Sequence, residues 1–175
     1  MGRHAGWIAT YAGIAGGATV ILVPELPFDI DEVCTILKRR HERGRFASIV
    51  VMAEGAEPQP GSLELEERAV DRHGHMRLAG TAYQIAPVIE ARTGFETRVV
   101  MLGHVQRGGT PCAYDRVLST RYGLAAIDAV HERAWGEMVV FREQRIERAP
   151  MAACVGRTRH LDMAMYTDVA EVFFG

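Results

Sequence analysis

The sequence predicts an α/β fold with a Rossmann-like parallel sheet and flanking helices. Short apolar runs of strand length alternate along the chain with segments whose hydrophobic residues follow helical spacing. Strands and helices in this order imply right-handed crossovers between parallel strands. The chain has 175 residues, of which 48% are apolar and 24% charged, enough for one sizeable core. We therefore expect one α/β unit over residues 1–175.

The first part of the chain predicts two helices and two strands in alternation. Gly16 and Gly17 end the first, alanine-rich helix, and Asp29 or Asp31 could cap the second. The two strands are short β-branched runs of the kind that parallel sheets bury. In order, the expected elements are a helix at 3–15, a strand at 19–24, a helix at 31–43 and a strand at 48–53.

The second part begins with a polar excursion that is long enough to hold a short hairpin. Its two histidines, His73 and His75, lie in a polar turn and are better explained as solvated side chains than as metal ligands. Residues 142–148 combine arginines with glutamates, which predicts a salt-bridged surface. The expected elements are the excursion at 56–78, a helix at 81–92, a strand at 97–103, a helix at about 114–133, a strand at 139–142 and a helix at 162–174.

Polar side chains follow three of the expected strands. Glu25 follows the first strand, Glu54 the second, and His104, Gln106 and Arg107 the third. The carboxyl ends of parallel strands share one edge, where ligands of α/β proteins bind, so these groups could converge. The guanidinium and imidazole lie next to two glycines that permit close backbone approach, which favours an anionic ligand such as a sugar phosphate.

Other residues leave alternatives open. Glu54 could accept two sugar hydroxyls, or it could be a cap or surface acid, and Glu25 could be structural or lie near a metal. Arg98 begins the third expected strand, roughly 20 Å from its far end, so one sugar phosphate could not easily touch both Arg98 and His104 within a subunit. From its position alone, Arg98 is predicted to be a solvated residue at the start of a strand. At the start of the chain, Gly2 would let a ligand approach the backbone closely. The amides that open the first helix would favour binding of an anion.

Two motifs in this sequence resemble the 6-phosphofructokinase family. They are Met-Gly-Arg-x-x-Gly, which starts at Met1, and Leu-Gly-His-x-Gln-Arg-Gly-Gly-x-Pro-x-x-Tyr-Asp-Arg, which starts at Leu102. The resemblance extends over nearly all 175 residues, and the long excursion is similar to the actinobacterial type, which includes ATP and pyrophosphate users. It implies a phosphotransferase that converts fructose 6-phosphate to fructose 1,6-bisphosphate with Mg²⁺ as cofactor.

The resemblance also implies a role for each matching residue. His104 and Arg107 would hold the 6-phosphate with Gln106 beside them, and Glu54 would bind the sugar. Arg98 would reach across a subunit interface of a homodimer or homotetramer into the neighbour's site. The remaining three, Met1, Gly2 and Arg3, would approach the sugar and its reacting end, with Arg3 able to stabilise charge on the transferred group.

The resemblance covers only the C-terminal, substrate-binding half of such an enzyme. In the family, the Met-Gly-Arg segment lies mid-chain, after a half that binds the phosphoryl donor and Mg²⁺ and carries the catalytic aspartate. This sequence has no glycine-rich donor-phosphate loop and no acid that matches that aspartate. We therefore expect no catalytic residue and no activity from this chain alone. A non-catalytic sugar-phosphate-binding or regulatory module, or a decayed gene product, remains an alternative.

Composition excludes several other classes of protein. A net charge of −2 and a pI near 6.4 argue against a nucleic-acid partner. The longest uncharged run, residues 5–24, is interrupted by glycines and is not expected to cross a membrane. No basic segment precedes a cleavable apolar stretch, and the three cysteines are widely spaced, so we expect reduced thiols in a cytoplasmic protein.

Overall fold

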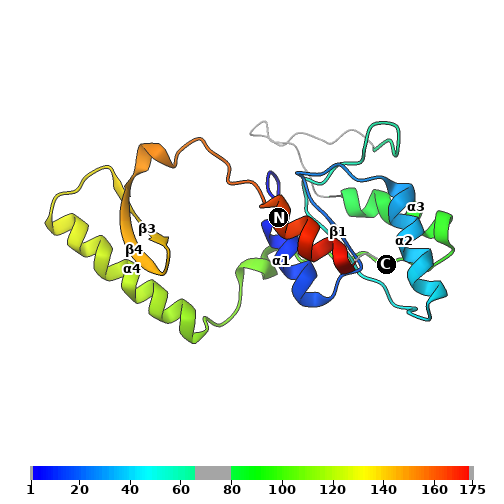
Figure 1. Ribbon diagram of the computed structural model, residues 1–175, viewed down its shortest axis with the longest axis horizontal. Helices are drawn as coiled ribbons and strands as arrows, with labels where there is room; N and C mark the ends of the chain where they lie inside the picture. The colour runs from blue at the N-terminus through cyan, green and yellow to red at the C-terminus, as the bar shows by residue number, and fades with distance from the viewer. Residues whose placement is uncertain (1, 66–79, 174–175) are drawn as a thin grey trace. The chain divides into compact units, whose positions relative to one another are not determined.

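The computed structural model describes residues 2–65 and 80–173, which form two compact units (Figure 1). Unit 1 comprises Met1–Met101 and Thr158–Gly175, and unit 2 comprises Leu102–Arg157. Met1 and most of the excursion expected at 56–78 lie outside the described residues, as do His73 and His75.

Unit 1 is an α/β sandwich built on a parallel two-stranded sheet. The strands pair with Val20 opposite Val50 and Leu22 opposite Met52. The expected alternation of helices and strands is therefore confirmed here, with bounds that differ by a few residues. The elements are α1 (Trp7–Gly16), β1 (Val20–Leu22), α2 (Ile30–Glu42), β2 (Val50–Met52) and α3 (Thr81–Thr93).

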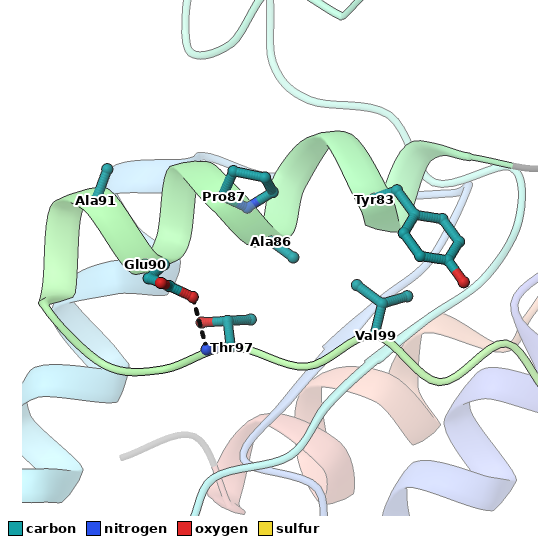
Figure 2. A pocket seen from close by; sticks show the side chains of 7 residues that line it. All are labelled: Tyr83, Ala86, Pro87, Glu90, Ala91, Thr97 and Val99. Carbon is teal, nitrogen blue, oxygen red and sulfur yellow. Dashed lines mark hydrogen bonds between the residues drawn. The ribbon is translucent and has the colours of Figure 1, made fainter.

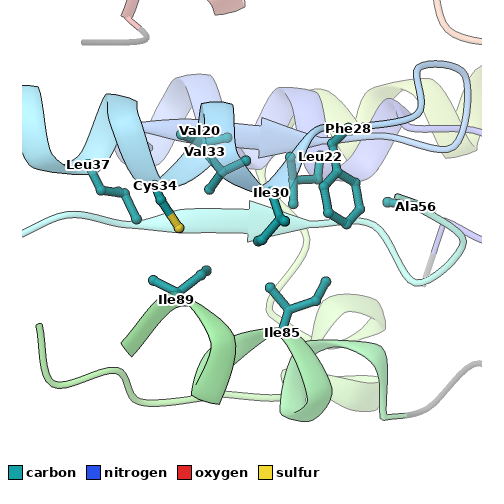
Figure 3. Packing of buried hydrophobic residues seen from close by; sticks show 10 residues of the cluster. All are labelled: Val20, Leu22, Phe28, Ile30, Val33, Cys34, Leu37, Ala56, Ile85 and Ile89. Atoms are coloured by element: carbon teal, nitrogen blue, oxygen red, sulfur yellow. The ribbon is translucent and has the colours of Figure 1, made fainter. Parts of the chain in front are cut away.

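One face of β1 packs against α2 and α3. Val20 and Leu22 contribute to this cluster from the strand, and burial of each such side chain stabilises the fold by about 1.5–3 kcal/mol. Cys34 lies in the same cluster, where burial raises the pKa of its thiol. Figure 3 shows the complete cluster: Val20, Leu22, Phe28, Ile30, Val33, Cys34, Leu37, Ala56, Ile85 and Ile89.

The other face of β1 packs against α1 and the end of the chain. Ile21 and Val23 point to this side, and the C-terminal residues Leu161, Tyr166 and Ala170 cover them. The Tyr166 hydroxyl donates a hydrogen bond to the carbonyl of Ile21 at 2.6 Å, and burial raises the pKa of this phenol. Because both faces of β1 are covered, its near-continuous apolar sequence is explained.

The terminal helix expected at 162–174 is present but irregular. It consists of three short consecutive pieces: α5 (Met163–Met165), the π-helical η3 (Tyr166–Ala170) and the 3₁₀ helix η4 (Glu171–Phe173). The Asp162 side chain accepts a hydrogen bond from the amide of Ala164 at 3.1 Å and so caps the start.

Asp29, rather than Asp31, caps α2. Its carboxylate accepts hydrogen bonds from the Asp31 amide at 2.8 Å and from the Ser62 hydroxyl at 2.9 Å. These two bonds favour the charged form and lower the pKa of Asp29.

The strand expected at 97–103 does not form, so that prediction was wrong. Residues 95–100 alternate between half-buried and exposed, as a strand with one packed face would, but they make no ladder. Val50 and Met52 of β2 and residues 95–100 are among the residues that line a groove of about 270 Å³. Without a neighbouring strand, the apolar run is left open, and Val100 is 79% exposed.

Unit 2 is a helix, α4 (Ala113–His131), packed on a hairpin of β3 (Glu137–Arg142) and β4 (Arg145–Pro150) (Figure 1). The half-buried residues of α4 follow helical spacing, namely Leu118, Arg121, Tyr122, Ala125 and Ala129. The Asp115 carboxylate accepts a hydrogen bond from the Cys112 amide at 2.9 Å, which caps α4 and lowers the pKa of Asp115. Asp115 therefore caps the start of this helix.

Residues 142–148, expected to be a salt-bridged surface, do carry ion pairs, from Arg148 to Glu132 and Glu137, and they also belong to a hairpin. They form the turn and half of an antiparallel pair, with Phe141 opposite Ile146. Glu143 and Gln144 have φ of 45° and 67°, the left-handed values that a tight hairpin turn requires. No helix within the described part of the chain is long and apolar enough to span a bilayer.

Candidate functional site

The carboxyl ends of β1 and β2 lie at one edge of the sheet, as the sequence predicts. The ladder extends beyond β2, because the Ala53 amide donates to the Leu22 carbonyl at 2.9 Å. Glu54 and Gly55 follow directly, while Glu25 follows β1. The third group, His104 to Arg107, follows no strand and belongs to unit 2.

Residues 2–3 pack closely against residues 54–55. The Gly55 amide donates a hydrogen bond to the Gly2 carbonyl at 3.0 Å, and Gly2 has φ of +81°, which favours glycine. A Cβ on Gly55 would lie only 2.0 Å from the Arg3 carbonyl oxygen. The two segments, more than fifty residues apart in sequence, can approach this closely only because residue 55 has no side chain.

This packing brings Arg3 next to Glu54. The Arg3 Nε lies 3.7 Å from the Glu54 Oε2, and the two side chains are 50% and 22% exposed. A guanidinium and a carboxylate that both reach solvent provide donors for an oxyanion and acceptors for hydroxyl groups. Of the residues expected to bind substrate, Arg3, Glu54 and Gly2 are therefore brought together.

The first helix begins at Trp7 and not at residue 3, and its N-terminus is already occupied. The Glu25 carboxylate accepts the Gly6 N–H, with Oε1 at 3.1 Å and Oε2 at 3.0 Å. We expected the amides that open this helix to favour an anionic ligand. The Gly6 amide instead binds a carboxylate of the protein itself.

In unit 2, the expected phosphate-binding residues lie on the 3₁₀ helix η1 (Gly103–Arg107). A 3₁₀ helix has three residues per turn, so positions 104 and 107 lie one above the other on the same face. His104 and Arg107 are exposed and Gln106 is half-buried. This local fold therefore presents an imidazole and a guanidinium side by side, an arrangement that suits one phosphate group.

Arg98 lies in unit 1, in the segment after α3. Its Nε and Nη2 both donate to the Glu96 Oε1, at 2.9 and 2.7 Å, and its side chain is 83% exposed. The segment is held against α3, since the Thr97 amide donates to the Glu90 carboxylate at 2.9 Å beside a groove of about 570 Å³ (Figure 2). The ion-pair partner of Arg98 is thus Glu96 and not a residue at the edge of the sheet.

The acidic residues of this edge do not fit a Mg²⁺ site. The Glu25 carboxylate accepts backbone N–H groups, and Glu54 faces the Arg3 guanidinium. Hard divalent cations need several oxygen ligands, and within residues 2–65 and 80–173 no three His, Cys, Asp or Glu side chains form a metal-binding group.

Comparison with known proteins identifies the family. The family model described as phosphofructokinase matches residues 1–130. The chain belongs to the phosphofructokinase family. It is 51% identical over all 175 residues to a pyrophosphate–fructose 6-phosphate 1-phosphotransferase of Streptomyces coelicolor. It is equally identical to an ATP-dependent 6-phosphofructokinase of Mycobacterium tuberculosis. The chain spans about half the length of these curated relatives, 51% in each case.

Solved phosphofructokinase structures have the same fold. A structure from Saccharomyces cerevisiae matches 99% of this chain and 21% of its own, with a TM-score of 0.70 and 32% identity. A pyrophosphate-dependent phosphofructokinase from Marinobacter aquaeolei matches 99% of this chain and 45% of its own, with a TM-score of 0.74 and 22% identity. The expected family and α/β fold class are both confirmed.

Sequence reasoning left the role of Glu25 open between a structural residue and a metal-proximal one. The structure favours the structural role, because the Leu161 amide also donates to the Glu25 Oε1, at 2.8 Å. Two features of the sequence could have indicated this structural role of Glu25: the residue directly follows an expected strand, and position 6 is a glycine.

Proposed function

We propose that residues 1–175 form the fructose 6-phosphate-binding half of a cytoplasmic 6-phosphofructokinase of glycolysis. The reaction moves a phosphoryl group from ATP or pyrophosphate to the 1-hydroxyl of fructose 6-phosphate and gives fructose 1,6-bisphosphate. The observation that carries this proposal is the presentation of His104 and Arg107 on one face of η1 within a chain of this family. Relatives of equal identity are named for different donors, so both donors enter the test.

The chain carries groups whose chemistry matches a phosphate and groups whose chemistry matches a sugar. Arg107 and His104 donate hydrogen bonds to the 6-phosphate, with Gln106 next to them on the same helix. Glu54 accepts hydrogen bonds from hydroxyl groups of the sugar. Arg3 and the backbone of Gly2 both lie next to Glu54. The Arg3 guanidinium stabilises charge on the phosphoryl group during transfer. Met1 lies outside the described residues, and its contact with the sugar is proposed from the family resemblance alone.

Phosphoryl transfer depends mainly on positioning of the acceptor and neutralisation of charge. The residues described supply the acceptor's position but no Mg²⁺ site, so we assign the metal, the donor and the base to a partner half. A Mg²⁺ ion bound with the donor would neutralise charge on the phosphates. Arg98 is proposed to complete the phosphate site of a neighbouring subunit in a homodimer or homotetramer.

A second candidate is a sugar-phosphate-binding or regulatory module without turnover. Both candidates require binding of fructose 6-phosphate, and only the first requires transfer when a donor-binding half is supplied.

The test is a chimera in which this chain replaces the 51%-identical region of the M. tuberculosis or S. coelicolor enzyme. Coupled assays with ATP and with pyrophosphate measure the formation of fructose 1,6-bisphosphate. We expect turnover with one donor, and Arg107→Ala should raise the KM for fructose 6-phosphate by about 10- to 150-fold, because it removes a charge-assisted contact.

Arg157→Ala is the matched control, because it removes another exposed arginine from the same unit. An inactive chimera that still binds fructose 6-phosphate would favour the module without turnover. An active chimera whose KM is unchanged by Arg107→Ala would rule out the proposed phosphate site.

A further inference from the structure

We infer that Glu25 is a positioning residue for the sugar-phosphate site, because it fixes the loop of residues 2–6 that carries Arg3. This inference rests on the proposed function, since it assigns Arg3 to the substrate. Glu25 itself is remote from solvent and touches no expected substrate-binding side chain among its hydrogen-bonding partners. It would act through the backbone of the loop.

The Glu25 carboxylate is a buried charge whose acceptors are satisfied by backbone donors. Its side chain is 8% exposed. The Gly6 amide lies 3.1 Å from Oε1 and 3.0 Å from Oε2, and the Leu161 amide lies 2.8 Å from Oε1. The Nδ1 of His160 stands 3.9 Å from Oε1. A charge withdrawn from water needs such partners, so the geometry around Glu25 is strongly constrained.

Gly6 is also fixed sterically. A Cβ at this position would lie 2.5 Å from the Val23 Cγ1 and 3.0 Å from the Glu25 Oε2. The C-terminal end of the loop, at Gly6, therefore lies in direct contact with Val23, just after β1. At its N-terminal side, the Gly2 carbonyl is bound by the Gly55 amide at 3.0 Å. Arg3 lies between these two fixed points, and its backbone position depends on both.

The same carboxylate ties the loop to the end of the chain. Leu161 is buried in the cluster with Val23, and the Trp7 indole N–H donates to the Arg159 carbonyl at 2.8 Å. The Arg159 guanidinium also lies over the Trp7 ring, 5.1 Å from its centroid. Glu25 thus joins three segments at the start of α1, and the loss of its carboxylate releases the loop at Gly6.

The test compares three variants of the full chain for affinity towards fructose 6-phosphate and for thermal stability. Glu25→Ala leaves the Gly6 and Leu161 amides without their acceptor, while Glu25→Gln keeps one oxygen where Oε1 stands. Tyr166→Phe is the control, because it removes the 2.6 Å bond to the Ile21 carbonyl and loosens the same C-terminal segment without touching the loop.

We expect Glu25→Ala to raise the dissociation constant for fructose 6-phosphate by about 10-fold or more, since small misplacements of binding groups have large effects. Glu25→Gln should restore most of the affinity, and Tyr166→Phe should change it by less than about 2-fold although its melting temperature falls. Hydrogen exchange at the Gly55 amide, which binds the Gly2 carbonyl, should accelerate in Glu25→Ala and stay unchanged in Tyr166→Phe.

Equal losses of affinity in Glu25→Ala and Tyr166→Phe, at equal losses of stability, would overturn the inference and leave Glu25 with a structural role only. So would unchanged exchange at Gly55 in Glu25→Ala. Failure of the unaltered chain to bind fructose 6-phosphate is a different result. It would overturn the proposed function, and with it the assignment of Arg3 to the substrate.

Discussion

Substitution of Gly55 by alanine should disturb both the stability of unit 1 and the binding of fructose 6-phosphate. The new Cβ would stand 2.0 Å from the Arg3 carbonyl oxygen and 2.7 Å from its carbonyl carbon. Ordinary contact begins at 3.4 Å, so the backbone of Arg3 must move by roughly 1.4 Å. Because both atoms belong to the backbone, no side-chain rotation can relieve the clash.

The expected cost of this overpacking is about 1–3 kcal/mol in the free energy of unfolding. For a chain of this length, each kcal/mol lowers the melting temperature by about 2–4 °C. Displacement of Arg3 by more than 1 Å should also weaken fructose 6-phosphate binding, by up to about 100-fold if Arg3 contacts the substrate. Thermal unfolding followed by circular dichroism and calorimetric titration measure the two effects on the same samples.

Gly16→Ala is the matched control. Gly16 ends α1, and a Cβ there would meet no atom within 4 Å. Alanine favours helix over glycine by up to about 1 kcal/mol, so this variant should be neutral or slightly more stable. If Gly55→Ala melted and bound like Gly16→Ala, the close approach of residues 2–3 to residues 54–55 would be refuted.

Three further outcomes follow from the same geometry and proposals. Mixed chimeric subunits carrying Arg98→Ala and Arg107→Ala should recover activity in hybrid oligomers, and no recovery despite demonstrated subunit exchange would contradict action of Arg98 across an interface. The 175-residue chain alone should give no turnover in coupled assays with either donor, whereas sustained turnover lost in Arg107→Ala would reveal a missed catalytic carboxylate. The apolar residues Leu124 and Ile127 are exposed on α4, so their joint replacement by glutamate should reduce self-association in sedimentation velocity, and unchanged association would exclude this face.

Hydrophobic patterning predicted the helices and the two paired strands of unit 1 well, because α2 buries one apolar face and β1 is an apolar run that is covered on both faces. It failed at residues 97–103 because an apolar run does not reveal whether a neighbouring strand is available to pair with it. It missed β4 because charged residues dominate that strand and its turn lacks the usual glycine or asparagine.

The sequence was sufficient to select candidate residues for a site but not to give the contacts that they make. The motif around His104 and Arg107 is local, so the sequence was sufficient to select it, although not its 3₁₀ geometry. The approach of Gly2 to Gly55 joins residues far apart in sequence. The role of Glu25 was open for a similar reason, since a carboxylate has the same sequence signature whether it binds an amide or a cation.

The most direct test of the central claim is a calorimetric titration of the purified chain with fructose 6-phosphate, and with fructose as a control for the phosphate. We predict saturable binding of fructose 6-phosphate at one site per chain, none of fructose at the same concentrations, and an affinity reduced about 10- to 150-fold by Arg107→Ala but not by Arg157→Ala. No saturable binding, or binding that Arg107→Ala leaves unchanged, would contradict the assignment of this chain as a fructose 6-phosphate-binding half.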